Sequence, residues 1–452
     1  ILLFFVAIIL NLTYLQIFAS EKIVSHPKNT RGIERELLIP RGSIVSADGE
    51  ILAKDVRMDG KFFRNYPFGE ITAHLIGFNS VKYGRSGVEA AFNDYLLGKR
   101  EAASIKDFID QLMGRQVGYD LELTLNAKLQ RKAAELLWDK KGAIVALNPK
   151  TGEILAMASN PTFNPNNIET LWKDLNKSLD APLLNRATQG LYPPGSTFKI
   201  ITAAAALEEK VAESSSVYEG PKELPIDGSS VTNFKDQNYG VMTLKRAFEV
   251  SCNTVFAQVG LELTADKLIE YAEKFGFNKD VPFELPSKQS KIGDPSEMDA
   301  VMLAWSAVGQ GETLATPLRV ALVVSVIAND GKMMKPFLVK EIRSSQGQLV
   351  KRFAPQILRK VLSQKTTQKM IEFMVAAVEG GTGRRAKIEG VTVAGKTGTA
   401  EAGKGKEPHA WFVAFAPAED PQIVIAVVVE NGGIGGKVAA PIARELIESF
   451  LK

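Results

Sequence analysis

The chain has 452 residues, a length typical of two or three domains with a sizeable buried core, and its 45% hydrophobic and 23% charged residues exclude wholesale disorder. Lys and Arg number 55 against 51 Asp and Glu, a net charge of +4 that is dispersed along the chain, so nucleic acid is not expected as a partner. One cysteine excludes an intramolecular disulfide, and with three scattered histidines it cannot form a Cys/His zinc site, so we expect no metal and no cofactor.

Residues 1–19 contain no charged side chain, and as a helix they would rise roughly 28 Å, close to the hydrocarbon thickness of a bilayer. This predicts one transmembrane anchor; a cleaved secretory signal is the alternative, although such signals are usually shorter and end in small residues. The first residue is Ile and no basic flank precedes the apolar run, so we expect the natural chain to begin earlier. Asn11 either lies near one membrane interface or faces a partner helix.

Residues 20–120 contain short strand-like pieces and a helical stretch at 87–99, joined by glycines and charged residues. We predict an irregular module with low intrinsic cohesion. Beyond this module, the apolar residues of 121–141 first alternate with polar ones, as in a strand, and then follow the spacing of a helix. Residues 142–159 then give two alternating runs around a turn that contains Pro and Gly, which predicts a hairpin.

The middle of the chain is rich in apolar helical runs, and its end returns to strands. Helices are predicted at 198–209, 244–250, 265–277, 316–330, 367–380 and 441–452, and strands at 391–402, 410–417 and 422–432. Because strands lie at both ends of a helical middle, we predict one antiparallel sheet built from non-contiguous segments, with helices packed on it. Residues 121–452 are therefore predicted to form an α+β domain.

A Ser-x-x-Lys tetrapeptide, Ser196 to Lys199, follows Tyr-Pro-Pro-Gly and opens an apolar helical run. Residues three apart share a helix face, so the Lys199 amine is expected beside the Ser196 hydroxyl, at the positive end of the helix dipole. A serine can be activated in this way without histidine. The same pattern occurs at 25–28, with a proline inside it, and at 449–452, where no helix begins. Alone, Ser196 could equally be a helix cap.

Ser251 and Asn253 form a second motif, Ser-x-Asn, which occurs once in the sequence, between two helical runs. A hydroxyl and a carboxamide two residues apart can reach into one cleft. The hydroxyl could relay a proton while the carboxamide holds a substrate amide. Taken alone, an ordinary Ser/Asn junction between helices is the better explanation.

Residues 396–399, Lys-Thr-Gly-Thr, form a third motif inside a predicted strand. Alternation places Lys396 and Thr397 on opposite faces, and Gly398 allows a ligand backbone to approach closely. Another Lys-Thr-Gly occurs at 150–152, but it occupies the predicted hairpin turn. Only the later copy lies on a strand.

A phosphate-binding loop is a rival interpretation of the third motif, because residues 390–397 satisfy the pattern G-x-x-x-x-G-K-[ST]. Such a loop must bend around phosphates and lead into a helix. Here the preceding residues are β-branched and alternating, and no helix start follows. We therefore favour the strand.

Ser-x-x-Lys, Ser-x-Asn and Lys-Thr-Gly in this order are the signature of penicillin-interacting serine acyltransferases, and the chain resembles a class B penicillin-binding protein, a monofunctional peptidoglycan transpeptidase. Nearly the whole chain takes part in the resemblance, which extends to residues 41–44, 48–49, 52–53, 87–89, 183–199, 309–311, 316–317 and 409–417. The family implies a serine β-lactamase/transpeptidase-like domain at 121–452, a pedestal module at 20–120 and the anchor at 1–19. It also implies a single-pass protein of the cell membrane, with its catalytic domain outside the cytoplasm.

This resemblance assigns roles to the motif residues. Ser196 would attack the penultimate carbonyl of a D-alanyl-D-alanine stem peptide, with Lys199 as the base. Ser251 would pass the proton to the departing D-alanine, helped by Lys396, while Asn253 holds the donor stem. An amine of a neighbouring stem would then take the acyl group and complete the cross-link in the cell wall.

The resemblance also implies how the substrate is held. Backbone N–H groups of Ser196 and Thr399 would form the oxyanion hole. The hydroxyls of Thr397 and Thr399 would bind the terminal carboxylate, and the stem would pair with the strand around Gly398 as an added strand. β-Lactams are expected as covalent inhibitors, and a SEDS-family glycan polymerase of the membrane as partner. Glycosyltransferase activity of the chain itself is not expected.

Two other functions use the same three motifs. A D,D-carboxypeptidase or β-lactamase would pass the acyl group to water, and a non-enzymatic β-lactam sensor would use the fold as a receptor. The long module before the domain and the predicted anchor favour the transpeptidase over a β-lactamase. Turnover on a donor and acceptor pair discriminates the three.

Overall fold

The structure is a computed structural model that describes residues 36–100, 116–403 and 405–452, together with the isolated residues Phe4, Phe5, Ile8, Asn11, Tyr14, Ile105, Ile109 and Met113. The predicted anchor, residues 1–19, lies outside the continuously described segments. Among the residues that are described, no helix combines the length and the apolar character needed to cross a bilayer.

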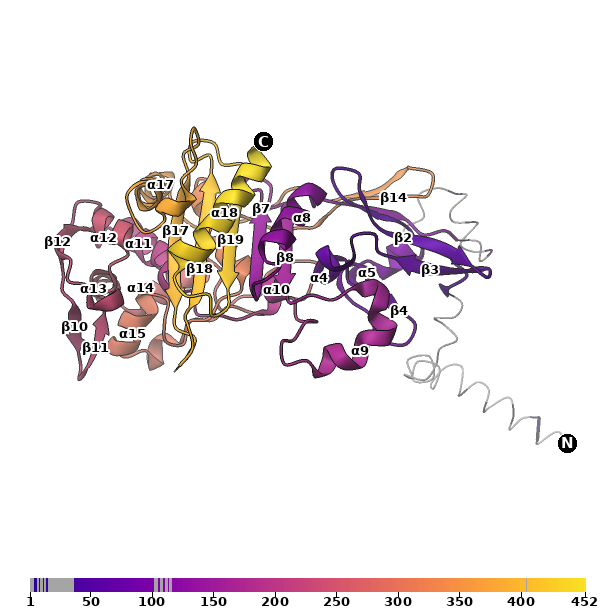
Figure 1. Ribbon diagram of the computed structural model, residues 1–452, viewed down its shortest axis with the longest axis horizontal. Helices are drawn as coiled ribbons and strands as arrows, with labels where there is room; N and C mark the ends of the chain where they lie inside the picture. The colour runs from indigo at the N-terminus through magenta and orange to yellow at the C-terminus, as the bar shows by residue number, and fades with distance from the viewer. Residues whose placement is uncertain are drawn as a thin grey trace.

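A five-stranded antiparallel sheet forms the centre of the larger part of the molecule (Figure 1). Its strand order is β17-β18-β19-β7-β8, so β7 and β8, which come first in the sequence, lie beside the three C-terminal strands. The prediction of one antiparallel sheet from both ends of a helical middle is therefore confirmed. The strands are β7 (Gly142–Leu147), β8 (Ile154–Asn160), β17 (Ala394–Ala400), β18 (His409–Ala416) and β19 (Ile423–Val429).

Helices bury both faces of this sheet. Along β18, Trp411 and Val413 belong to one apolar cluster, whereas Phe412 and Ala414 belong to another. This follows from the two-residue period of a strand. The covering helices are α8 (Ala127–Leu136) and α18 (Gly435–Leu451) on one face and α16 (Pro317–Ala328) on the other.

The start of α18 differs from the prediction. The sequence predicts this last helix over residues 441–452. The structure begins it at Gly435, with Pro441 inside the helix. Gly436, Ala439 and Ala440 are buried against the sheet, and this packing of small residues extends the helix beyond the start that local preference indicates.

A lobe of helices lies beside β17, at the end of the molecule opposite β2 and β3 (Figure 1). The predicted helices at 198–209, 244–250, 265–277, 316–330 and 367–380 are all present. The lobe contains α11 (Lys199–Glu208), α12 (Leu244–Val250), α13 (Asn253–Leu263), α14 (Ala265–Lys274), α15 (Ala300–Ala307) and α17 (Gln364–Glu379).

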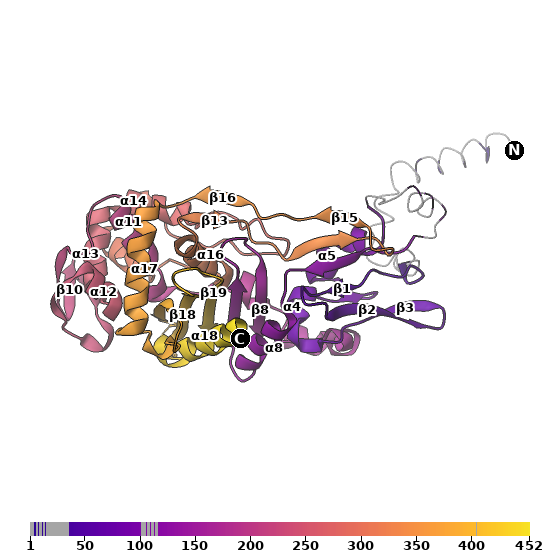
Figure 2. The same ribbon diagram turned by 90° about the horizontal axis from the view of Figure 1, so that it is seen from above.

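A second sheet joins the N-terminal module to the larger part, with strand order β15-β14-β6-β1-β2-β3. Strands β14 and β15 come from far along the chain and reach back to the module as an arm (Figure 2). The predicted boundary at residue 120 falls at the start of β6, inside this shared sheet. Its strands are β1 (Ile44–Val45), β2 (Ile51–Met58), β3 (Lys61–Asn65), β6 (Asp120–Leu123), β14 (Val339–Arg343) and β15 (Leu349–Arg352).

A buried ion cluster holds the N-terminal module together. Glu89, which is fully buried, accepts hydrogen bonds from Arg41 Nε at 2.7 Å and Arg64 Nε at 2.5 Å. Asp55 completes the cluster, since it pairs with Arg64 at 3.1 Å and accepts the backbone N–H of Arg41 at 2.7 Å. Burial alone would raise the pKa of Glu89, but the two guanidinium groups outweigh it and hold this pKa below its ordinary value.

Candidate active site

Ser196 lies on a 3-10 turn, Gly195–Thr197, that leads into α11 at Lys199. The sequence predicts that Ser196 opens the helix itself, but in the structure this tighter turn precedes the helix, and residues three apart in it are eclipsed. Gly195 has φ +52°, and a Cβ atom there would lie 3.0 Å from Thr399 O. The turn therefore packs directly against β17.

Lys199 is fully buried and directs its amine at the Ser-x-Asn motif. Nζ donates to Asn253 Oδ1 at 2.7 Å and to the backbone oxygen of Ser251 at 2.8 Å, and it lies 3.4 Å from Ser251 Oγ. Within the described part of the chain, no hydrogen bond joins this amine to the Ser196 hydroxyl. The first two motifs thus meet through the lysine.

Ser251 and Asn253 lie where one helix ends and the next begins. Ser251 is the left-handed C-cap of α12, with φ 63° and ψ 41°, a conformation that is uncommon for a residue other than glycine. Asn253 is the first residue of α13, and its Nδ2 donates to Thr232 O at 2.9 Å. The sharp change of direction presents hydroxyl and carboxamide to the same lysine.

Lys396 approaches Ser251 from the sheet. Its amine donates to Ser251 Oγ at 2.8 Å and to Thr397 O at 3.1 Å, and its side chain is fully buried. Thr397, the next residue on the strand, pairs instead with Thr382, with 2.6 Å between the two hydroxyl oxygens. The Ser251 hydroxyl therefore lies between two buried amines.

Both amines titrate below the ordinary lysine range. Burial lowers the pKa of Lys199 to about 7. Burial, reinforced by the positive charge of Lys199, holds the pKa of Lys396 well below its ordinary value. Aromatic rings contribute to this dry environment. The centre of the Phe256 ring lies 5.4 Å from Lys199 Nζ, and the centre of the Phe248 ring lies 5.4 Å from Lys396 Nζ. Burial and mutual repulsion thus favour the neutral form of these amines, which is the form that can accept a proton.

Gly398 lets β17 pass close to the nucleophile turn. A Cβ atom at this position would lie 3.0 Å from both Pro194 O and Thr197 Cγ2, and 2.8 Å from Trp411 Cβ. One residue further, Thr399 Oγ1 accepts the backbone N–H of Gly435 at 3.3 Å. The third motif lies on a strand, as predicted, and no helix follows it directly, which excludes the phosphate-loop interpretation.

An open cleft of about 720 Å³ is lined by part of this constellation, while the fully buried Lys199 and Lys396 are not among its lining residues. The predicted site residues that line it are Ser196, Ser251, Asn253, Thr397 and Thr399. Its rim carries the exposed basic side chains of Lys235, Arg384, Arg385 and Lys437 and the acidic side chains of Asp236 and Glu401. The cleft is large enough for an extended peptide with an anionic end.

The other copies of the motifs lie elsewhere. The Lys-Thr-Gly at 150–152 occupies the turn between β7 and β8, and Ser449 belongs to the last turns of α18. The Ser-x-x-Lys at 25–28 lies outside the described residues. Asn233 and Thr382 also line the cleft and are not among the predicted site residues. For Thr382, the sequence offers one signal, the glycine-rich run at 380–383.

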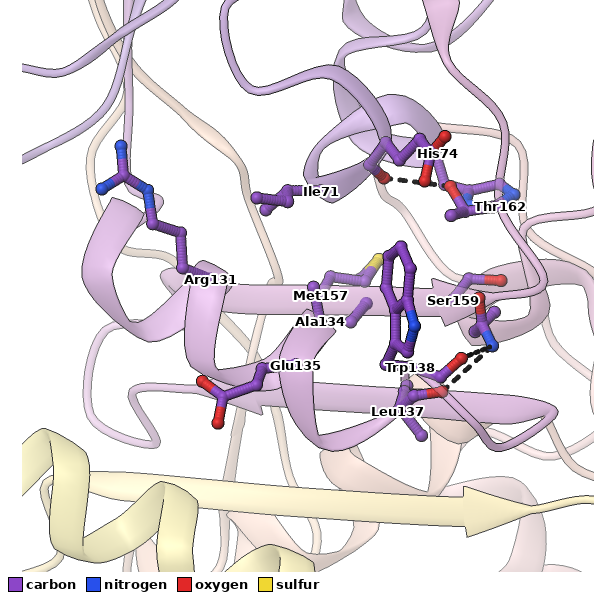
Figure 3. Close-up of a pocket in the computed structure, with 13 residues that line it drawn as sticks. Ile71, His74, Arg131, Ala134, Glu135, Leu137, Trp138, Met157, Ser159 and Thr162 are labelled. Carbon is purple, nitrogen blue, oxygen red and sulfur yellow. Dashed lines mark hydrogen bonds between the residues drawn. The ribbon is translucent and has the colours of Figure 1, made fainter.

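A second pocket, of about 260 Å³, lies where the N-terminal module meets α8 and β8 (Figure 3). Its walls include Ile71, His74, Trp138 and Met157. His74 Nε2 lies 2.9 Å from Pro182 O, and burial lowers the pKa of this histidine to about 4. None of the predicted site residues lines this pocket, so it does not compete with the cleft as the reaction site.

Comparison with known proteins connects the site to a family. The chain matches the model of the penicillin binding protein transpeptidase domain over residues 142–448 and that of the penicillin binding protein A dimerisation domain over residues 41–119. It is 36% identical over 480 residues to peptidoglycan D,D-transpeptidase PbpA of Mycolicibacterium smegmatis, an alignment that covers 100% of this chain and 97% of the relative.

Solved structures agree with these matches. The D,D-transpeptidase domain of a peptidoglycan glycosyltransferase from Eggerthella lenta superposes with a TM-score of 0.85 at 39% identity, covering 91% of this chain and 98% of that one. Penicillin-binding protein A from M. tuberculosis, as a penicillin G acyl-enzyme complex, superposes with a TM-score of 0.85 at 34% identity, covering 92% of this chain and 100% of that one.

Proposed function

This chain belongs to the class B penicillin-binding proteins and is a peptidoglycan D,D-transpeptidase, and we propose that it acts through an acyl-enzyme on Ser196. The observation that carries the assignment is the Ser251 hydroxyl between the Lys199 and Lys396 amines, in the cleft that Ser196 lines. A serine paired with buried amines can be activated where histidine is not used.

Acylation begins when Ser196 Oγ attacks the penultimate carbonyl of the donor stem. Its proton passes to neutral Lys199, whose lowered pKa suits a base at neutral pH. Catalytic hydrogen bonds often tighten only when substrate is bound, and we assign the Ser196–Lys199 bond to that complex. The C–N bond to the terminal D-alanine then breaks, and the departing amine takes a proton through Ser251 from the lysine pair.

The strand β17 would hold the donor stem. It lies at the edge of the five-stranded sheet, so one side of its backbone is open to an added strand. The Thr397 and Thr399 hydroxyls would bind the terminal carboxylate, and the backbone N–H groups of Ser196 and Thr399 would stabilise the oxyanion. Asn253 Nδ2 and Oδ1 are oriented by Thr232 and Lys199, ready to meet a stem amide.

In the second step an amine of a neighbouring stem attacks the ester and the cross-link forms. Contacts along the cleft can orient the amine of a bound acceptor stem toward the ester, whereas a free water molecule has no such contacts to orient it. Covalent inhibition by β-lactams follows from the same chemistry: the penicillin ring opens onto Ser196, and its leaving nitrogen stays tethered in the adduct.

We also propose that residues 1–19 anchor the chain in the cell membrane, with the catalytic domain outside the cytoplasm and a SEDS-family glycan polymerase as partner. The uncharged run at 1–19 and the long module that carries none of the motifs support this. Exchanging residues 1–19 for an unrelated apolar helix should preserve penicillin binding and abolish co-purification with the polymerase. Unchanged co-purification would reduce the segment to a tether.

Penicillin labelling tests the acylation site. Ser196→Ala should abolish the covalent adduct while the protein keeps its melting temperature, because Ser196 is a small, partly exposed residue on a turn and belongs to no apolar cluster. Ser449→Ala, which removes the serine of another Ser-x-x-Lys copy, is the matched control and should label like the wild type. The measurement is intact-protein mass spectrometry with peptide mapping. An adduct that persists in Ser196→Ala would overturn the assignment.

A further inference from the structure

Asn233 is a buried carboxamide in the wall of the cleft that none of the three motifs includes. It follows β11 (Ser229–Thr232), and only 3% of its surface is exposed. Burying an amide is costly unless its oxygen and nitrogen find partners. Here both atoms are fully engaged.

The oxygen of Asn233 caps a helix from another segment. Oδ1 accepts the backbone N–H of Asn253 at 2.7 Å and of Thr254 at 3.2 Å. These are the first N–H groups of α13, which have no partner inside the helix. The N-cap residue normally supplies the acceptor, but Cys252 makes no such bond. Asn233 supplies it instead.

The nitrogen of Asn233 ties this cap to its surroundings. Its two N–H groups have three acceptors in range: Pro221 O at 2.8 Å, Gln237 O at 3.0 Å and Thr254 Oγ1 at 3.1 Å from Nδ2. With acceptors on one side and donors on the other, the carboxamide has a single satisfied orientation. The start of α13 is thereby joined to the loops around β11.

This cap is one contact away from the reacting groups. Asn253, whose backbone N–H Asn233 holds, accepts the Lys199 amine on its side-chain oxygen at 2.7 Å. The nitrogen of the Asn253 side chain, Nδ2, donates to the backbone oxygen of Thr232, the residue before Asn233, at 2.9 Å. Segment 232–233 thus determines where Asn253 sits and which way its oxygen points.

We infer that Asn233 is a positioning residue: it holds the start of α13 so that Asn253 directs the Lys199 amine toward the reacting serine. The inference deepens the proposed function, because it concerns how the same site is held. Asn233 acts through Asn253 and contributes no proton of its own. Its loss should therefore reduce the acylation step more than it reduces folding.

Asn233→Ala tests this against a matched variant, Asn126→Ala. Asn126 also caps a helix, α8, by accepting Leu129 N at 2.8 Å, and it does not line the cleft. Each variant loses one helix cap, so both should melt below the wild type, and Asn233→Ala, which also leaves Pro221 O and Gln237 O without their donor, should have the lower melting temperature of the two. The acylation rate constant with a fluorescent penicillin should fall by about 10²-fold in Asn233→Ala alone, the loss expected for a misplaced reacting group.

Two further measurements keep the inference falsifiable. The dependence of the rate on penicillin concentration should assign most of the loss to the acylation step rather than to the initial affinity. Asn233→Asp retains an oxygen for both backbone N–H groups but loses the N–H donors to Pro221 O and Gln237 O. It should therefore acylate faster than Asn233→Ala and more slowly than the wild type, and it is measured in place of Asn233→Ala if that variant does not fold. Wild-type acylation rates in Asn233→Ala, or an equal loss in Asn126→Ala, would overturn the inference. If instead Ser196→Ala were still labelled, the proposed function would fail.

Discussion

At the scale of single residues, the chemistry depends on Ser251. Its hydroxyl accepts from Lys396 at 2.8 Å and lies 3.4 Å from Lys199, so it can take a proton from one amine while giving its own to the other. The backbone holds Ser251 in the left-handed region to achieve this, a conformation that persists only where its surroundings enforce it. The enforcement comes from the junction of α12 and α13.

The two lysines should have separable roles. Lys199→Ala removes the proposed base, so the acylation rate constant should fall by about 10²- to 10⁴-fold. Lys396→Ala leaves the base in place and should retain slow acylation, with weaker recognition of the carboxylate. Lys150→Ala changes the lysine of the other Lys-Thr-Gly copy, an exposed residue paired with Asp420, and should acylate normally. A Lys199→Ala variant as fast as the wild type would reject the assignment.

The pH dependence of acylation should report the pKa of Lys199. Burial lowers this pKa to about 7, and only the neutral amine can act as a base. The second-order rate constant for penicillin should therefore rise as pH increases through about 7 and level off above it. Rates measured between about pH 5 and pH 9 check this. A profile that is flat over this range would show that Lys199 does not titrate in the rate-limiting step.

At the scale of elements, periodicity predicted most of the larger domain. The hairpin at 142–159, the three C-terminal strands and the helices around them are all found, and superposition on solved transpeptidases confirms the α+β fold. The three motifs were predictable because each combines reactive side chains at short spacing. Their convergence was not, since Ser251 and Lys396 are 145 positions apart and meet only through packing.

Other elements carried no usable local signal. Helix α18 begins before Pro441 because small residues pack on the sheet, a tertiary effect that outweighs local preference. Asn233 was overlooked for a related reason. An isolated asparagine after a short strand suggests a turn, and only the fold shows that it caps a helix twenty residues later.

Gly398→Ala tests how closely β17 must approach the nucleophile turn. The new methyl group would lie 2.8 Å from Trp411 Cβ and 3.0 Å from Pro194 O, so the strand must move away from the turn. We expect a loss of stability of about 1–3 kcal/mol. Acylation should fall by about 10²-fold, because the serine shifts relative to β17. Thermal melting and penicillin labelling measure the two effects.

Gly293→Ala provides the comparison for that variant. A methyl group there would come no closer than 3.3 Å to any neighbour, and the nearest atom is the flexible end of Met298. Its melting temperature and acylation rate should stay close to those of the wild type. Equal behaviour of the two variants would contradict the argument from close approach.

At the scale of the whole molecule, the N-terminal module and the larger domain share one sheet. Strand β6 pairs with β1 on one side and with β14 on the other, so segments about 300 residues apart are joined in one hydrogen-bonded ladder. Separating the two parts would expose backbone groups and the buried side chains of Leu121, Leu123 and Ile342. We therefore expect the two parts to unfold together.

Glu89→Gln tests this coupling, because the cluster of Glu89 with Arg41 and Arg64 lies in the module, far from the cleft. The substitution keeps the shape but leaves two buried guanidinium groups short of a counter-charge, at a cost of about 3–5 kcal/mol. The folded-state pKa of Glu89 lies below its ordinary value, so its contribution to stability is complete above that value and is lost as pH falls through the lowered pKa. Calorimetry should show a single transition at a lower temperature, while Glu135→Gln, at an exposed pair with Lys132, should scarcely change it. Two transitions, of which only the first moves, would show that the shared sheet does not couple the parts.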